Sequence, residues 1–142
     1  MTVLVVDGQG GRLGSQLVKE IVQRFPEHDL LAVGTTSMAT ERMLKAGAAR
    51  AATGENAVAV ACRRADVIVG PVGMVIADAL LGEVTPAMAE AVGCSGAVRI
   101  LLPSDKCDTL IAGIGGQGMS ALIADAMDKL GVVLAQKTTQ EG

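Results

Sequence analysis

The chain has 142 residues, a net charge of −3 and a hydrophobic fraction of 50%, which together suit one folded domain. No apolar run approaches the roughly 20 residues that span a bilayer, and no basic block favours nucleic acid, so we expect neither partner. Three cysteines and one histidine form no metal signature. With no secretion signal ahead of the first strand, they predict reduced thiols and a cytoplasmic protein.

The predicted elements alternate between buried strands and amphipathic helices. Strands are expected at residues 2–7, 29–34, 48–52, 66–70 and 98–102, and a sixth edge strand is considered at 110–112. Helices are expected at residues 11–24, 37–46, 55–64, 74–81, 86–92 and 119–130. Short strand–helix connections predict an α/β fold, a Rossmann-like three-layer doubly wound parallel sheet with strand order 3-2-1-4-5. We expect one nucleotide-binding domain over 1–135 and a frayed tail over 136–142.

The first strand leads into a glycine-rich loop and then a helix. The loop reads Asp7-Gly8-Gln9-Gly10-Gly11-Arg12-Leu13-Gly14. Glycines allow positive φ and close backbone approach, and a helix N-terminus offers free N–H groups to an anion. The spacing of Gly8, Gly11 and Gly14 matches G-x-x-G-x-x-G, a dinucleotide-loop variant, whereas the strict G-x-G-x-x-G spacing fails. The pattern predicts a nucleotide site over Gly8–Leu13; a tight turn alone is the alternative.

The end of the second strand bears on which nucleotide binds. An acidic residue there would hold the ribose diol of NAD, but the chain has Gly34-Thr35-Thr36 and no carboxylate before Glu41. Arg12 lies in the glycine loop, and arginine suits a 2′-phosphate. These residues favour NADP, or a phosphorylated mononucleotide, over NAD. Alternatively, the two threonines only cap the following helix.

A second glycine-containing loop follows the fourth strand, Gly70-Pro71-Val72-Gly73. In the predicted strand order, strands one and four flank the switch point, and ligands bind there beyond the carboxyl ends of the strands. Two separate stretches therefore predict one crevice, unless this second loop is a plain turn between a strand and a helix.

Four further residues are candidates for catalysis. Glu55 follows the third strand, where it could bind a ribose or act as a base, or could simply suit the first turn of a helix. Asp78 is the lone charge in the apolar helix expected at 74–81; it could be a base or pair with an arginine. Burial of that helix against a second copy favours a homodimer. Lys106 beside Cys107 could make the thiol reactive, or could be a solvated loop.

A second glycine cluster, Gly113–Gly118, precedes the last predicted helix. It could bind a second anion or provide a flexible lead into that helix. The chain has one histidine, His28, and neither tyrosine nor tryptophan. It therefore offers no Ser-His-Asp or Cys-His arrangement and no tyrosine proton donor.

Seven stretches, taken together, resemble one known family. They are residues 5–11, 34–40, 43–48, 52–57, 69–73, 81–90 and 106–107. Their combination is similar to a family of short bacterial proteins described as domain of unknown function 3842, and the resemblance covers residues 2–110. The resemblance implies a Rossmann-like fold, and it implies no particular activity or substrate.

Three functions are consistent with the sequence. The first is a small protein that binds NADP or a related nucleotide and acts as a sensor or an accessory subunit. The second is an NADP-dependent reductase or a nucleotide-modifying enzyme whose pocket a dimer partner completes. The third is an interaction module with a vestigial site, which would use the apolar stretch 74–81. The sequence shows no evident acid–base pair, so binding ranks above catalysis.

Overall fold

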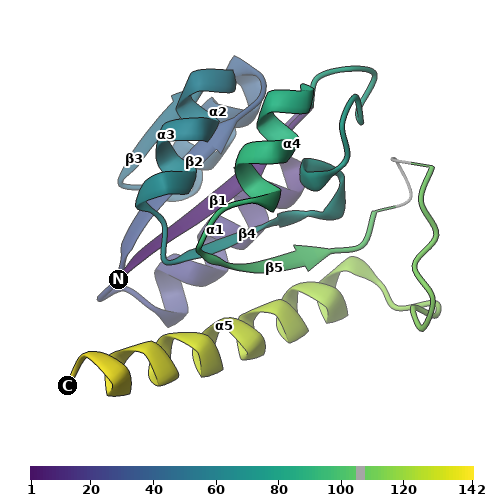
Figure 1. The fold of residues 1–142 in the computed structure, drawn as a ribbon. Coiled ribbons are helices and arrows are strands. Elements are labelled where there is room, and N and C mark those ends of the chain that lie inside the picture. The colour runs from purple at the N-terminus through teal and green to yellow at the C-terminus, as the bar shows by residue number, and fades with distance from the viewer. Residues whose placement is uncertain (105–107) are drawn as a thin grey trace.

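The computed structural model describes residues 1–104 and 108–142, in which helices cover both faces of a sheet (Figure 1). The strands are β1 (Thr2–Asp7), β2 (Asp29–Gly34), β3 (Arg50–Thr53), β4 (Val67–Pro71) and β5 (Val98–Leu102). The helices are α1 (Arg12–Arg24), α2 (Ser37–Ala46), α3 (Glu55–Arg64), the 3-10 helix η1 (Val72–Val75), α4 (Pro86–Gly93) and α5 (Met119–Glu141).

The strands of the described sheet are all parallel and follow the order β3-β2-β1-β4-β5. The central strand β1 pairs with β2 on one side and β4 on the other, with Val5 opposite Ala32 and Val69. This order confirms the predicted fold class. The chain moves outward from β1 in opposite directions, so the switch point lies between the carboxyl ends of β1 and β4.

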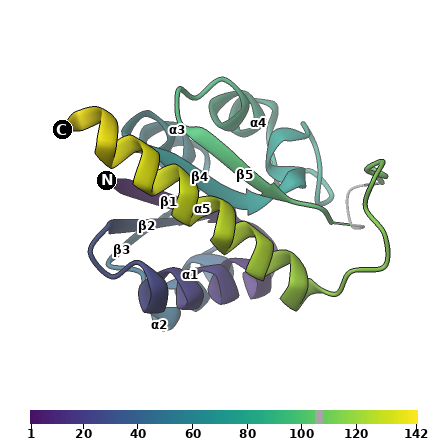
Figure 2. The same cartoon turned by 90° about the horizontal axis from the view of Figure 1, so that it is seen from below.

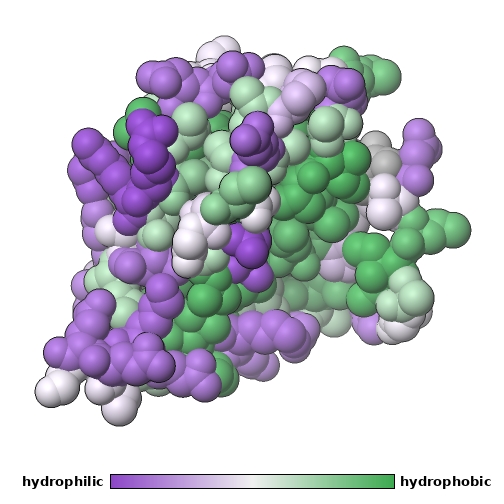
Figure 3. All heavy atoms as spheres, viewed as in Figure 1, coloured by the Kyte–Doolittle hydropathy of each residue, from purple (hydrophilic) through white to green (hydrophobic). Residues whose placement is uncertain are grey.

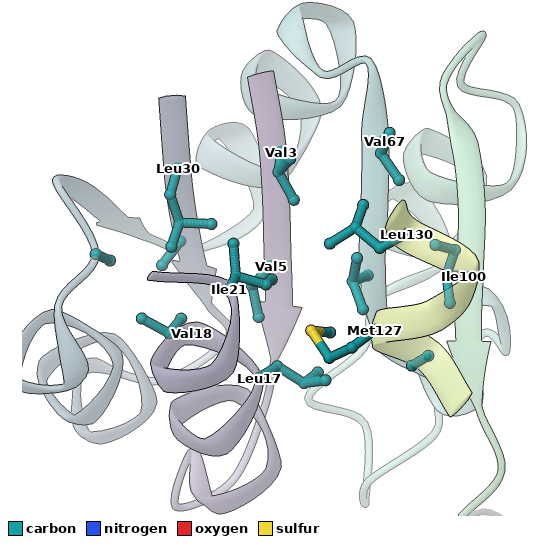
Figure 4. Packing of buried hydrophobic residues seen from close by; sticks show 14 of the residues in the cluster. Val3, Val5, Leu17, Val18, Ile21, Leu30, Val67, Ile100, Met127 and Leu130 are labelled. Atoms are coloured by element: carbon teal, nitrogen blue, oxygen red, sulfur yellow. The ribbon is translucent and has the colours of Figure 1, made fainter. Parts of the chain in front are cut away.

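Two apolar clusters fill the spaces between the sheet and its helices. Val3 and Val5 face α1, α2 and α5, whereas Leu4 and Val6 face α3 and α4, because successive side chains of a strand alternate between faces. In Figure 4 the first cluster joins β1, α1 and α5, and Figure 2 shows α5 crossing that face of the sheet. Each large side chain buried there contributes about 1.5–3 kcal/mol. The two layers hold the strand ends, and the loops that follow them, in place.

The helix predicted at 74–81 is not formed. The chain makes the short helix η1 and then a series of turns, with positive φ at Asp78, Leu80 and Leu81. Buried Met74 and Ala79 anchor this stretch on the α3 and α4 side. Isolated helices this short are marginal in water, so the packing of single side chains decides the shape of this stretch.

Two further predictions near the C-terminus are wrong. Residues 110–112 form no strand; the side chain of Leu110 is 98% exposed, and the chain has left the sheet after β5. The last helix does not end at Leu130 but continues to Glu141. Leu130 and Leu134 are both buried, and Gly131 between them lies against the ring of Phe25, so packing offsets the cost of a helical glycine. The division into 1–135 and 136–142 stays a prediction.

Candidate functional site

The loop between β1 and α1 is held from beneath by Asp7. This buried carboxylate accepts the backbone N–H of Gly8 at 2.8 Å and that of Gly14 at 2.7 Å. A Cβ atom on Gly14 would lie 2.7 Å from the Cβ of Asp7, so only glycine allows this approach. Sequence reasoning did not identify Asp7 as the residue that joins both ends of the loop. Its place at the end of β1, seven residues before Gly14, is the one signal that could have done so.

The turn itself depends on left-handed backbone at two positions. Gln9 has φ of 49° and Gly11 has φ of 71°, and the N–H of Gly11 donates to the carbonyl of Gly8 at 3.0 Å. A Cβ on Gly11 would lie 2.6 Å from the Cα of Ala39 in α2. The start of α1 is thus pressed against α2, which fixes where its N-terminus points.

Several loop N–H groups remain available to a ligand. No side chain caps the N-terminus of α1. The N–H groups of Gly10, Arg12 and Leu13 donate to no residue in the described part of the chain. Free N–H groups, the positive end of a helix dipole and an arginine together attract an anion such as a phosphate.

A cavity of about 850 Å³ lies beside this loop, at the carboxyl ends of β1, β4 and β5. Its walls include all of Gly8–Leu13, Pro71, Pro103 and Ser104, together with residues from 109–122. Ile111, Ile114 and Leu122 give it an apolar part. Among the described lining residues, only Asp7 and Arg12 carry charge. A cavity of this size, with both polar and apolar lining residues, can take a molecule as large as a nucleotide.

Only one residue of the predicted loop after β4 lines the same cavity as the glycine loop. Pro71 lines the cavity, but Gly70, Val72 and Gly73 are not among its lining residues. A Cβ on Gly70 would lie 2.5 Å from the carbonyl oxygen of Val6, so this glycine permits close packing of β4 on β1. The two loops therefore lie at one crevice, to which the second contributes one residue.

The predicted residues after β2 lie on the other side of the glycine loop. Gly34, Thr35 and Thr36 do not line the cavity. Thr36 caps α2 by accepting the N–H of Ala39 at 3.1 Å, and its hydroxyl donates to the carbonyl of Gln9 at 2.7 Å. Thr35 donates to a carboxylate oxygen of Glu83 at 2.8 Å. Both hydroxyls are thus engaged within the chain.

The catalytic candidates do not gather at the cavity. Glu55 is exposed at the start of α3, and Asp78 is exposed in a turn; neither lines the cavity. Lys106 and Cys107 lie outside the described residues. Burial raises the pKa of the Cys62 thiol to about 11, so it stays protonated and unreactive at neutral pH. The described residues hold no group of side chains that could bind a metal ion.

Two further segments contribute to the site. Glu83 reaches the glycine loop from a stretch 74 residues further along the chain, where no local pattern marks it. The second glycine cluster supplies Ile114, Gly115 and Gln117 to the cavity wall. In Figure 3 apolar side chains gather at this end of the molecule, where Leu110, Ile111 and Ile114 are exposed.

The helices of the described residues include none with the length and apolarity needed to cross a membrane. The cytoplasmic location and the homodimer stay predictions; the helix that motivated the homodimer is not formed.

Comparisons with known proteins complete the description. No curated protein matches the chain. One solved structure with a similar fold is a dodecameric FMN-dependent Ubix-like decarboxylase from Escherichia coli O157:H7, at 16% identity and a TM-score of 0.48. The match covers 94% of this chain and 76% of that chain. The model of the family described as Domain of unknown function (DUF3842) matches residues 2–135, nearly the whole chain. The chain therefore belongs to this family, as its motifs predict.

Proposed function

We propose that this protein binds a phosphorylated mononucleotide in the cavity at the carboxyl ends of β1, β4 and β5, and acts as a sensor or an accessory subunit. The phosphate would lie on the N–H groups of Gly10, Arg12 and Leu13, with the Arg12 guanidinium beside it. The base would lie against Ile111, Ile114 and Leu122. The observation that carries the proposal is the loop of free N–H donors in the wall of a nucleotide-sized cavity.

The sequence leaves NADP and a mononucleotide open, and the geometry favours the mononucleotide. A dinucleotide on this fold extends one half across the end of β2. That end does not line the cavity, and the hydroxyls of Thr35 and Thr36 are already engaged. The prediction of NADP rests on Arg12, and the thermal-unfolding experiment described below tests it as well.

Binding ranks above catalysis for a specific reason. The enzyme alternative relies on Glu55, Asp78, Lys106 and Cys107. The first two do not line the cavity. A reaction would then have to use other groups, whereas binding needs only the loop, the arginine and the apolar wall.

Thermal unfolding with a panel of ligands tests the proposal. AMP, FMN, NAD and NADP are each added to the wild type, to Arg12→Ala and to Arg63→Ala, an exposed arginine on the opposite face of the sheet. A ligand at 100 times its Kd adds about 2.7 kcal/mol of stability, which is a clear rise in Tm. Loss of one charge-assisted hydrogen bond in Arg12→Ala weakens binding about tenfold.

The control Arg63→Ala should bind as the wild type does. If none of the four ligands stabilises the wild type, the proposed function is wrong. If NADP alone gives a shift, and Arg12→Ala abolishes it, the NADP prediction replaces the mononucleotide.

A further inference from the structure

The glycine loop already carries an anion from its own chain. One carboxylate oxygen of Glu83 accepts the backbone N–H of Gln9 at 2.7 Å and the hydroxyl of Thr35 at 2.8 Å. The same oxygen lies 3.1 Å from the position that a Cβ on Gly8 would take. Glu83 thus lies over the side of the loop next to the end of β2, here called the β2 side.

The segment that presents Glu83 is firmly tied at its base. The N–H of Asp78 donates to the carbonyl of Val84 at 2.7 Å, and the N–H of Val84 donates to Ala79 at 3.2 Å. Ala79 and Val84 are buried in the cluster beneath α4. The carboxylate is therefore held against the loop by a closed turn and not by a free side chain on an extended strand.

Leu80 of the same segment separates the two sides of the loop. Its Cδ1 atom lies 2.7 Å from the position of a Cβ on Gly8, and it also lines the cavity. A ligand in the cavity therefore meets Leu80 where a longer ligand would continue across Gly8 toward β2.

The hydrogen-bond donors at the loop fall into two groups, one on the β2 side and one on the cavity side. On the β2 side, Glu83 takes the N–H of Gln9 and the hydroxyl of Thr35. On the cavity side, the N–H groups of Gly10, Arg12 and Leu13 stay available within the described chain. A second phosphate placed on the β2 side would find its donors occupied and would face a like charge, which disfavours it.

We propose that Glu83 is a specificity-determining residue that restricts this site to ligands with one nucleotide unit. The inference rests on the proposed function and names the class of nucleotide that the site rejects: dinucleotides, whose second half would have to lie where Glu83 lies. The carboxylate acts by occupying the donors and by repelling phosphate.

Matched pairs of ligands test this by calorimetry. AMP is compared with NAD, and FMN with FAD, because each dinucleotide contains its mononucleotide. In the wild type we expect the mononucleotide that binds to do so at least tenfold more tightly than its dinucleotide. In Glu83→Ala the dinucleotide should gain at least fivefold in affinity while the mononucleotide changes less than twofold.

Two control variants distinguish a change in specificity from a loss of folded structure. Glu83→Gln keeps a carbonyl oxygen that can accept both hydrogen bonds but removes the charge, so it should give a smaller gain in the same direction. Glu90→Gln, an exposed glutamate in α4, should leave both affinities unchanged. The ratio of the two affinities is compared within each variant, so a partly unfolded sample does not alter it.

Each other outcome overturns the inference in a recognisable way. If mononucleotides bind and the ratio is the same in the wild type, Glu83→Ala and Glu83→Gln, Glu83 does not set specificity and the proposed function stands. If the wild type binds dinucleotides as tightly as mononucleotides, the inference is also wrong. If no nucleotide binds the wild type, the proposed function fails and the inference fails with it.

Discussion

The two glycine-rich segments of this chain look alike in sequence and differ in every contact. Gly8, Gly11 and Gly14 leave no room for a Cβ, since each would meet another atom within 2.7 Å. A Cβ on Gly113, Gly116 or Gly118 would meet no atom of the described residues within 4 Å. The first segment is held by Asp7, Thr36 and Glu83, whereas the second lies exposed on the far wall of the cavity.

The difference shows that glycine has two separate uses here. In the first segment it permits close approach to the loop backbone, by side chains at Gly8 and Gly14 and by the backbone of α2 at Gly11, and the gain is a fixed set of N–H groups. In the second segment Gly113 has a positive φ of 87°, whereas a Cβ on Gly116 or Gly118 would meet no atom of the described residues within 4 Å, so packing does not require glycine there. The first segment lines the cavity with N–H donors, and the second lines it with Ile114, Gly115 and Gln117.

The largest expected effect is that of Gly11→Ala. The new Cβ would lie 2.6 Å from the backbone of Ala39, at a φ of 71°. Strain and overpacking together should cost about 4 kcal/mol, measured by urea unfolding. The matched control is Gly10→Ala in the same loop, where the nearest atom is the sulfur of Met38 at 3.9 Å and the cost should be within about 0.5 kcal/mol. Equal urea midpoints for Gly11→Ala and Gly10→Ala would contradict the expectation that, of these two positions, only position 11 lacks room for a Cβ.

Next in size is the effect of Asp7→Ala. The change removes the acceptor of two N–H groups and leaves the buried N–H of Gly14 without its partner. Loss of hydrogen bonds to a charged group should cost about 3 kcal/mol of unfolding free energy. Asp7→Asn keeps one carbonyl acceptor and should lose less. A variant Asp7→Ala as stable as the wild type would show that the loop keeps its shape unaided.

Removal of the Thr36 hydroxyl should have a moderate effect. Thr36→Val loses the cap of α2, worth about 1 kcal/mol, and the bond to Gln9, worth about 1 kcal/mol more. Thr85→Val removes the equivalent cap of α4, which accepts the N–H of Met88 and lies outside the glycine loop. The difference between the two variants, measured by chemical unfolding, isolates the bond to Gln9. No difference would mean that Thr36 only caps its helix.

The smallest effect is expected for Gly116→Ala in the second segment. The new methyl group meets open space, so stability should change by no more than about 0.5 kcal/mol. The measurement is the same urea titration that is used for Gly11→Ala. A loss above about 2 kcal/mol, the scale of an overpacked site, would mean that the second segment is packed as tightly as the first.

Much of the fold could be predicted because its signals are local. The alternation of apolar strands with amphipathic helices, and the right-handed crossovers between them, are enough to place β1–β5 and their order. The stretch 74–81 has the hydrophobicity of a buried helix, but Met74 and Ala79 are buried as single anchors of a short turn. Gly131 by itself predicts the end of the last helix, but packing against Phe25 overrides this local signal.

For the site, the sequence by itself determined the loop Gly8–Leu13, since a strand, a glycine turn and a helix start are neighbours along the chain. Only the tertiary structure decided what surrounds that loop. Glu83 lies 74 residues from Gln9 along the chain. Ile111 lies in the stretch 110–112, where the sequence predicts an edge strand that is not formed, and Ile114 lies in the glycine cluster that follows. Such contacts depend on how whole elements pack, so no local spacing could have placed a carboxylate on one side of the loop and an apolar cavity on the other.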